Sequence, residues 1–299
     1  VAAAPILFVP NAANRVLSFR VGPATTGDVA PRNNLVSATP GPNTTNAAVA
    51  DIVGGLIVAN ADGPRIEAFI NGASLSGTRT PDASIVNPAG LLSGPQDFAY
   101  DRVNNRLFVA NFDGGSINRF DAASSALTGA PSGRILSTAI VNPRGIYLAA
   151  NGELYAANAG NQTISVFSNP ATINTTVNAT RVLTGTALSA NQPYDLVIDS
   201  SDRLLMISGS GPRILVFVNA RDASGPVEPV AILTIPGANP LTGIAQDAAG
   251  RTYVADAIAN AVYIFESLPN TTQNVTPSRV LFGPTTLISS PQRLFVLNR

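Results

Sequence analysis

Four residue types are missing from this chain of 299 residues: it has no His, Cys, Trp or Lys, and all 18 basic residues are Arg. Without His there is no Ser-His-Asp triad and no imidazole ligand for zinc. Without Cys there is no disulfide, no thiolate nucleophile and no ligand for an iron–sulfur cluster. Without Lys there is no Schiff base to pyridoxal phosphate. Only carboxylates, hydroxyls, Tyr, Arg and carboxamides remain for catalysis, which excludes most familiar enzyme mechanisms.

Charged residues are scarce, at 12% of the chain against about 25% in an average soluble protein. The 18 acidic residues balance the 18 basic ones, and no basic cluster marks a nucleic-acid surface, so we expect no nucleic-acid partner. The mean hydropathy is positive. Two interpretations fit: an uncharged surface of Ser, Thr, Asn and Gly, or a surface partly buried against other subunits or covered by glycans.

The sequence contains no run of about 18 apolar residues, so it predicts no transmembrane helix. The chain begins with Val1 and continues Ala-Ala-Ala-Pro, which is typical of an N-terminus left by removal of a signal peptide. The absence of Cys is compatible with both the cytosol and the exterior. We therefore expect an exported protein, extracellular or on the cell surface, with the periplasm as an alternative.

An Ile/Val-x-x-Phe motif recurs along the whole chain. Its six copies are Val16–Phe19, Ile66–Phe69, Ile117–Phe120, Ile164–Phe167, Ile214–Phe217 and Val262–Phe265. Successive Phe residues lie 50, 51, 47, 50 and 48 residues apart. A period of this length indicates a propeller or a solenoid, because each repeat buries its apolar face against its neighbours. Six repeats over residues 1–299 leave no room for a second domain, so we predict a single domain.

Alignment on the Phe predicts four strands per repeat, A to D. Strand A begins at a Pro, as in residues 95–101, 143–149 and 193–199. Strand B is a continuous apolar run such as LFVAN (107–111), as expected of a sheet covered on both faces. Strand C carries the repeated motif. Strand D follows a long connection rich in Thr, Pro, Gly and Asn, and a Pro just before it in five repeats predicts that D is the outer edge.

The two ends of the chain predict how the repeats close. The N-terminus opens with a B strand (6–11), and the C-terminus ends with a surplus A strand (291–297). Antiparallel pairing of these two segments completes the sixth repeat and removes two free sheet edges. A solenoid has no need of such pairing. We therefore predict an all-β, closed six-bladed β-propeller with four antiparallel strands per blade.

The repeat resembles the NHL-repeat propellers, most closely in GIAQDAAGRTYVADAIANAVYIFE (243–266). The sequence before strand D resembles the NHL-like repeats of secreted bacterial proteins. The resemblance covers the whole chain and implies the fold, but it does not imply one function, because such propellers include enzymes, ligand binders and scaffolds. The lyase and streptogramin-inactivating members rely on His, which this chain lacks.

The starts of A strands and the ends of B strands meet on one face of a propeller, and the polar residues there form a predicted cup. Its members are Gln96, Asp97, Arg144, Asp195, Thr242, Gln292 and Arg293 from the A strands, with Asn11, Asn60, Asn111, Asn158, Ser208 and Asp256 from the B strands. We interpret Gln96, Asp97, Arg144, Asp195, Asn111, Asn158 and Asp256 as candidate ligand-binding residues. Such a cup could hold a small polar ligand or, through oxygens, a Ca²⁺ ion. The alternative is structural: the Asn and Asp side chains close the turn after each B strand.

The resemblance also suggests an alternative function, that of a metal-dependent, lactonase-like hydrolase. Its metal site would need a Glu, an Asn and one or two Asp. The chain has only four Glu residues, at 67, 153, 228 and 266, and none lies at the start of an A strand. The required Glu is therefore missing, and we predict no catalytic residue, no cofactor and no metal ligand. The alternative is that this hydrolase uses a site of carboxylates and carboxamides at the channel mouth.

Six Asn-x-Ser/Thr sequons are candidate glycosylation sites: Asn43, Asn161, Asn174, Asn178, Asn270 and Asn274. The last four lie in two C–D connections, on the face opposite the predicted cup. They fit glycosylated or adhesive loops of a surface protein or, alternatively, turn-rich solvated connections. Together these patterns favour an exported, non-catalytic propeller that binds or scaffolds other proteins, most concretely a subunit of an extracellular surface assembly formed with protein partners or with itself.

Overall fold

The computed structural model describes residues 4–39, 45–86, 90–124 and 129–298. Its B strands are almost wholly buried, as the continuous apolar runs predict: β1 (Ile6–Asn11), β5 (Leu56–Asn60), β10 (Arg106–Asn111), β14 (Leu154–Asn158), β19 (Leu204–Ser208) and β24 (Thr252–Asp256). Only Arg106, at the start of β10, is not fully buried. Both faces of each sheet are covered by neighbouring sheets, which removes any need for a polar face.

The C strands carry the repeated Phe and pair antiparallel with the B strands. They are β2 (Arg15–Arg20), β6 (Arg65–Phe69), β11 (Ser116–Asp121), β15 (Thr163–Phe167), β20 (Arg213–Phe217) and β25 (Ala261–Phe265). All six motif Phe side chains are buried, with exposed fractions of 1–3%. Six apolar clusters form the core, each built from two neighbouring sheets. The motif therefore recurs because every sheet needs the same packing surface against the next one.

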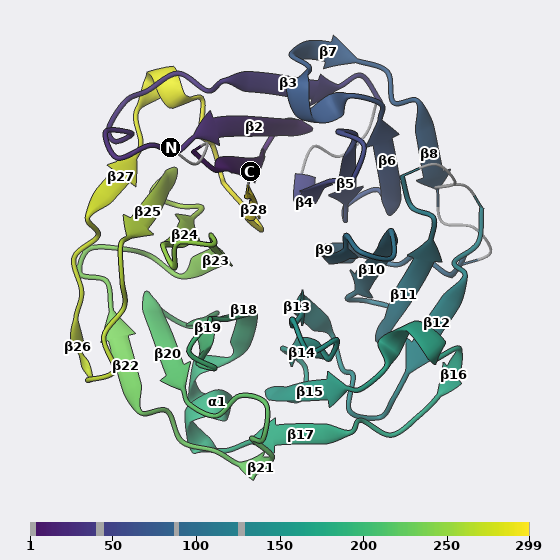
Figure 1. The fold of residues 1–299 in the computed structure, drawn as a ribbon, viewed down its shortest axis with the longest axis vertical. Coiled ribbons are helices and arrows are strands. Elements are labelled where there is room, and N and C mark those ends of the chain that lie inside the picture. The colour runs from purple at the N-terminus through teal and green to yellow at the C-terminus, as the bar shows by residue number, and fades with distance from the viewer. Residues whose placement is uncertain (1–3, 40–44, 87–89, 125–128, 299) are drawn as a thin grey trace.

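Six sheets stand in a ring around a central axis, with the A strands innermost (Figure 1). The A strands are β4 (Thr45–Ala50), β9 (Pro95–Asp101), β13 (Pro143–Leu148), β18 (Pro193–Ile198), β23 (Leu241–Gln246) and β28 (Phe295–Leu297). The D strands are β3 (Asn33–Ser37), β8 (Ala83–Val86), β12 (Gly133–Leu136), β17 (Arg181–Thr184), β22 (Ala231–Thr234) and β27 (Arg279–Leu281). The predicted six-bladed, all-β propeller is confirmed. We number blades 1 to 6 by their B strands in chain order, so blade 1 contains β1.

Blade 1 contains both ends of the chain. The C-terminal strand β28 pairs antiparallel with β1 through Ile6 opposite Leu297, Leu7 opposite Val296 and Phe8 opposite Phe295. In Figure 1, β28 lies on the inner side of the blade that contains β2 and β3. The strand predicted over 291–297 is shorter than expected, because regular pairing begins only at Phe295. Before it, the N–H of Gln292 donates to the carbonyl of Pro10 at 3.0 Å, so the contact with blade 1 begins ahead of the strand.

The prediction that strand D is the outer edge of each blade is wrong for most blades. Among the described residues, a short fifth strand runs parallel to D in four blades: β7 (Gly77–Arg79) beside β3, β16 (Thr175–Thr176) beside β12, β21 (Gly225–Pro226) beside β17 and β26 (Gln273–Asn274) beside β22. Each fifth strand comes from the C–D connection of the following blade. In blade 6 a single bridge, Gly27 to Leu281, takes the same place. The long connections therefore cover sheet edges that would otherwise expose unpaired backbone groups.

Helix is a minor part of the fold. The α-helix α1 (Thr186–Asn191) lies between β17 and β18, and the described residues also contain the short 3₁₀ turns η1 (Gly72–Ser74), η3 (Pro170–Thr172) and η4 (Pro284–Thr286). Within the described ranges, none of these helices has the length and apolar character needed to cross a bilayer.

Candidate functional site at the central channel

The third residue of each A-strand segment forms a ring that breaks the repeat symmetry. In blade order from blade 2 the ring reads Ala47, Asp97, Gly145, Asp195, Gly243 and Arg293, and all six are buried. A bulge precedes this position in blades 2 to 6, where the strand pairing skips the second residue. At Asp97 and Asp195 the side chain that follows the bulge lines the channel cavity, and bulges commonly aim side chains at a site in this way. Charge is thus concentrated at three of six equivalent positions.

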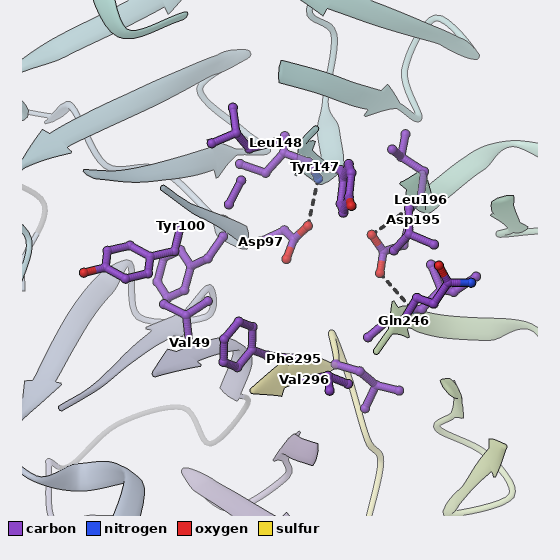
Figure 2. Close-up of a pocket in the computed structure, with 17 residues that line it drawn as sticks. Val49, Asp97, Tyr100, Tyr147, Leu148, Asp195, Leu196, Gln246, Phe295 and Val296 are labelled. Carbon is purple, nitrogen blue, oxygen red and sulfur yellow. Dashed lines mark hydrogen bonds between the residues drawn. The ribbon is translucent and has the colours of Figure 1, made fainter. Parts of the chain in front are cut away.

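Asp97 and Asp195 each bind the A strand of the next blade. The Oδ2 of Asp97 accepts the backbone N–H of Ile146 at 2.7 Å. The Oδ2 of Asp195 accepts the N–H of Ile244 at 2.9 Å, and its Oδ1 accepts the N–H of Leu196 at 2.8 Å. Figure 2 shows the two carboxylates on opposite sides of the same channel, each with its hydrogen bond to the neighbouring strand. Both side chains therefore hold blades together while they face the axis.

Arg293 supplies the only positive charge in this ring of six. Its Nε lies 4.0 Å from the Oδ2 of Asp195. Its Nη1 donates to the carbonyl of Thr242, and its Nη2 donates to the carbonyl of Tyr194 at 3.2 Å. The guanidinium carbon lies 4.3 Å from the centre of the Tyr194 ring, within the range of a cation–π contact. Arg293, which is 3% exposed, thereby ties blade 1 to the A strands of blades 5 and 6.

The environment of the two carboxylates favours their neutral forms. Burial raises the pKa of Asp97 well above its usual range, and the charge of Asp195 raises it further, against the opposing effects of Arg293 and the Ile146 N–H. Burial also raises the pKa of Asp195, although the charge of Arg293 and the N–H groups of Ile244 and Leu196 lower it. Two carboxylates that face one channel beside a single guanidinium do not both ionise easily, because like charges repel strongly where water is excluded.

A cavity of about 180 Å³ extends from the carboxylates along the inner A strands. Its wall is mixed: apolar residues such as Ala99, Leu148 and Leu196 line it together with polar ones, among them Tyr147 and Gln246. At the end away from the carboxylates, Tyr100, Tyr147, Gln246 and Val296 are partly exposed. Typical small-molecule pockets measure about 300–1,000 Å³. This cavity can therefore take only a very small ligand or a few waters.

The structure brings only some of the predicted candidates to the channel. Asp97 and Asp195 line the cavity. Arg144 does not line the cavity; its guanidinium carbon is 4.6 Å from the Phe112 ring centre and 4.7 Å from that of Tyr194. Gln96 is partly exposed and accepts a hydrogen bond from the Nδ2 of Asn46 at 3.0 Å. Tyr194, which stacks with two arginines, was not predicted, although it occupies the same position after a Pro as Gln96 and Arg144.

The other three candidates, Asn111, Asn158 and Asp256, do not line the cavity and are fully buried at the ends of their B strands. Asp256 accepts hydrogen bonds from the N–H groups of Ile258 and Ala259 in its own turn. Asn158 donates to the Oγ of Ser165 at 2.6 Å, and Asn111 donates to the carbonyl of Leu91 at 3.4 Å. Contrary to the sequence prediction, these three residues do not share an open cup with the A-strand residues. Buried backbone groups next to each turn need partners, and these side chains supply them.

The donor set does not fit a divalent cation. Calcium takes about six to eight oxygen ligands. Here the carboxylates of Asp97 and Asp195 already accept the backbone N–H groups of Ile146, Phe98, Ile244 and Leu196, and the guanidinium of Arg293 lies beside Asp195. In the part of the chain that the structure describes, no three His, Cys, Asp or Glu residues gather as a metal-binding group. A calcium ion at this ring would have to displace these backbone hydrogen bonds.

The sequons lie on exposed residues wherever they are described. Asn161, Asn174, Asn178, Asn270 and Asn274 are all exposed, whereas Asn43 falls outside the described residues. Asn274 belongs to β26, so its backbone is part of a sheet. The side chain of Asn270 accepts a hydrogen bond from Arg203 at 2.6 Å. These connections are therefore both edge-covering strands and exposed surfaces.

No protein-family model matches the sequence, and no curated protein does. Solved structures do match. One is a crystal structure of a nidogen/laminin complex, with a TM-score of 0.64, 12% identity and 98% of both chains covered. The likeness shows a β-propeller fold. A second propeller match is virginiamycin B lyase from Staphylococcus aureus, with a TM-score of 0.53 and 12% identity over 83% of this chain and 73% of that one.

A third match is the hydrazine synthase of Kuenenia stuttgartiensis, with a TM-score of 0.54 and 14% identity. It covers 75% of this propeller but only 63% of the hydrazine synthase chain. At such low identities the three likenesses establish the fold and leave the function open, because one propeller architecture serves many unrelated activities.

Proposed function

We propose that this chain is an exported, non-catalytic binding or scaffolding module with protein partners, most concretely a subunit of an extracellular surface assembly. One observation carries the proposal. The charged side chains of the channel ring bind the backbone of neighbouring blades: Asp97 binds Ile146, Asp195 binds Ile244, and Arg293 binds two carbonyl groups. Side chains that hold the ring together are poor candidates for catalytic groups, because catalysis requires free acids, bases or ligands.

The surface supports a protein partner. Several aliphatic side chains are largely exposed, among them Val103 (93%), Val86 (70%) and Ile258 (69%). Only 12% of the residues are charged, so little charge must be desolvated when a partner covers this surface. A propeller of similar fold was solved in a nidogen/laminin complex, which is consistent with protein binding by this architecture.

The NHL-like repeat and the exported location belong to the same proposal. They rest on the motif pattern and on the exposed sequons of two C–D connections. Glycans on Asn178 or Asn274 would project from the outer rim and leave the channel free.

The lactonase-like hydrolase has one observation in its favour: Asp97 and Asp195 face the same channel, and burial raises the pKa of both. The double variant Asp97→Asn with Asp195→Asn separates the two functions. A hydrolase would lose stoichiometric metal and activity while it stays folded. The binding module has no bound metal to lose, and its association with partners should be unchanged.

Sedimentation and electron microscopy of natively isolated protein, across a salt series, test the proposed assembly. We expect association that persists at high salt, because few charges are available to be screened. The contacts should bury at least about 1,000 Å², as stable interfaces do. A monomer at every concentration and salt, with a divalent ion bound in stoichiometric amount by elemental analysis, would defeat the assembly and favour the hydrolase.

A further inference from the structure

The second residues of the six A-strand segments form a ring of their own at the end of the channel where the A strands begin. This end lies on the face opposite the A–B turns, and we call it the A-start mouth. All six residues are polar, and all except the buried Asn46 are partly exposed. Arg144 is the only charged member, so the ring contains no carboxylate. In blade order from blade 2 it reads Asn46, Gln96, Arg144, Tyr194, Thr242 and Gln292.

The guanidinium of Arg144 is held by aromatic rings and has unused donors. It lies over the rings of Phe112 and Tyr194, with its central carbon 4.6 and 4.7 Å from the ring centres. Among the described residues it donates no hydrogen bond and forms no ion pair, even with the exposed Asp113 that follows Phe112 in the sequence. Stacking engages the face of a guanidinium and leaves the N–H groups at its edge free.

The other arginines that lie over aromatic rings are bonded differently. In the part of the chain that the structure describes, Arg102, Arg181 and Arg293 also stack on Tyr rings. Each of them donates hydrogen bonds to backbone carbonyl groups as well. Stacking and hydrogen bonding therefore go together elsewhere in this fold, and the free N–H edge is particular to Arg144.

The charges near the A-start mouth favour an anion. Arg293 lies over the same Tyr194 ring, at 4.3 Å, and its buried Nε has no hydrogen-bond acceptor. Burial raises the pKa of Asp97 and of Asp195, which favours their neutral forms. The two carboxylates therefore compensate the two guanidinium groups only in part, and positive potential remains at this end of the channel.

The geometry of the free edge selects the kind of anion. A guanidinium presents parallel N–H groups that match the two oxygens of a carboxylate. One free guanidinium also suits a single negative charge better than the double charge of a phosphate. We propose that Arg144 binds a carboxylate group at the A-start mouth. The group belongs either to a free organic acid or to an acidic side chain of a protein partner, and the site does not depend on the proposed assembly.

Nuclear magnetic resonance of the ¹⁵N-labelled full chain tests the site with acetate as the probe. Acetate replaces chloride at constant ionic strength and at about pH 6, where acetate is ionised. We expect a saturable shift of the Arg144 Nε–H resonance and of the backbone N–H resonances of Gly145 and Tyr194. Saturation should lie in the millimolar range, because a single partly exposed ion pair binds weakly. Because chloride is present throughout, a saturable shift reports a preference for the carboxylate.

The variant Arg144→Gln should weaken acetate binding by at least about tenfold, measured on the backbone resonances of Gly145 and Tyr194, because it removes the charge-assisted hydrogen bonds. Arg144→Lys keeps the charge without the paired N–H groups, so its affinity should fall between those of the wild type and Arg144→Gln. The matched control is Arg32→Gln, which changes an exposed arginine just ahead of β3 and should bind acetate as the wild type does.

Two further ligands complete the test on the wild-type chain, so the outcome does not depend on the folding of a variant. The uncharged acetamide should bind at least about tenfold more weakly than acetate. N-acetylglutamate N-methylamide presents the carboxylate of a protein side chain: its binding assigns the site to an acidic side chain of a partner, and binding of acetate alone assigns it to a free acid. No saturable shift with acetate, equal affinity for acetamide, or equal binding of acetate by Arg144→Gln would overturn the proposal.

Discussion

Single residues in the channel ring explain how neighbouring blades approach so closely. A Cβ atom on Gly145 would lie 2.6 Å from the Cα of Asp195 and 2.9 Å from the carbonyl of Tyr194. A Cβ on Gly243 would lie 3.0 Å from the Cα of Arg293. In both cases the obstacle is backbone of the next blade, which cannot rotate away. Asp and Gly therefore alternate around part of the ring for a packing reason. Each Asp carboxylate binds the A strand of the next blade, and each Gly leaves room for the backbone of the blade that follows.

The substitution Gly145→Ala should destabilise the protein by about 1–3 kcal/mol, as overpacking of a well-packed interior does. Gly211→Ala is the matched control, because a Cβ there meets no atom within 4 Å. Chemical unfolding of both variants measures the difference. Equal stabilities would show that the A strands can separate without cost, against the close contact described here.

The raised pKa of Asp97 predicts how stability depends on pH. Between the ordinary aspartate pKa of the unfolded chain and the raised pKa of the folded one, the folded state binds more protons, so its stability falls as pH rises. The loss is fully developed above the folded pKa and amounts to at most about 1.4 kcal/mol per unit of pH within the window. Asp97→Asn removes this titration while its amide oxygen can still accept the Ile146 N–H.

We therefore expect Asp97→Asn to be more stable than the wild type at high pH and to show a flatter dependence on pH. Denaturant unfolding across a pH series measures both. Asp195 also has a raised pKa, so some slope should remain. An unchanged slope in the variant would mean that Asp97 is ionised in the folded protein throughout this range.

At the scale of elements, the repeated Phe residues fix the packing between blades. Each motif Phe of a C strand stands opposite the first or second residue of its B strand, as Phe120 does opposite Leu107 and Phe217 opposite Leu204. Both are buried, at 3% and 2% exposed. They belong to different core clusters, one between blades 2 and 3 and the other between blades 4 and 5.

Phe120→Ala and Phe217→Ala should each cost about 3–5 kcal/mol of unfolding free energy, as large-to-small core substitutions do. Phe282→Ala is the control, because Phe282 is 53% exposed and its removal leaves no cavity. Losses below about 1 kcal/mol at the two motif positions would contradict the packing of C strands between blades.

The fifth strands were the main element that sequence patterns missed. In three of them the N–H of the following Val donates to the preceding blade: Val177 to Leu136, Val227 to Thr184 and Val275 to Thr234, at 2.8–2.9 Å. Two of these Val residues stand two positions before a Pro, as in Val-Glu-Pro and Val-Thr-Pro. The Val-x-Pro pattern was visible in the sequence, but a strand of two residues is too short to show a periodicity of its own. Their existence depends on an edge that the previous blade provides.

At the scale of the whole molecule, blade 1 joins three N-terminal strands to one C-terminal strand. The pairing between β1 and β28 is short, with three residue pairs. It is extended by Gln292, whose N–H binds Pro10, and by Arg293, whose N–H binds Asn46 of blade 2 at 3.1 Å. The last nine residues therefore contact four blades (1, 2, 5 and 6), since the Arg293 side chain also reaches Tyr194 and Thr242.

Deletion of residues 291–299 should expose the edge of β1 and remove the Arg293 contacts, which we expect to cause aggregation or loss of a cooperative thermal transition. Deletion of residues 298–299 alone, beyond β28, is the control and should preserve the transition. Calorimetry with light scattering measures both effects. An unchanged melting curve for the longer deletion would mean that the ring does not depend on this strand.

The sequence by itself determined the repeat, the order of strands in a blade and the burial of the motif Phe, because each blade repeats the same local pattern and packs against a copy of itself. Tertiary structure alone decided the site. Asp97 and Asn111 are both polar residues at predicted strand ends, yet Asp97 faces the channel and binds Ile146, 49 residues away, whereas Asn111 is fully buried at the end of its B strand. A bulge, a Gly on the next blade and a distant Arg293 set that difference. None of these contacts leaves a local trace in the sequence, because the partners meet only when the ring of blades has formed.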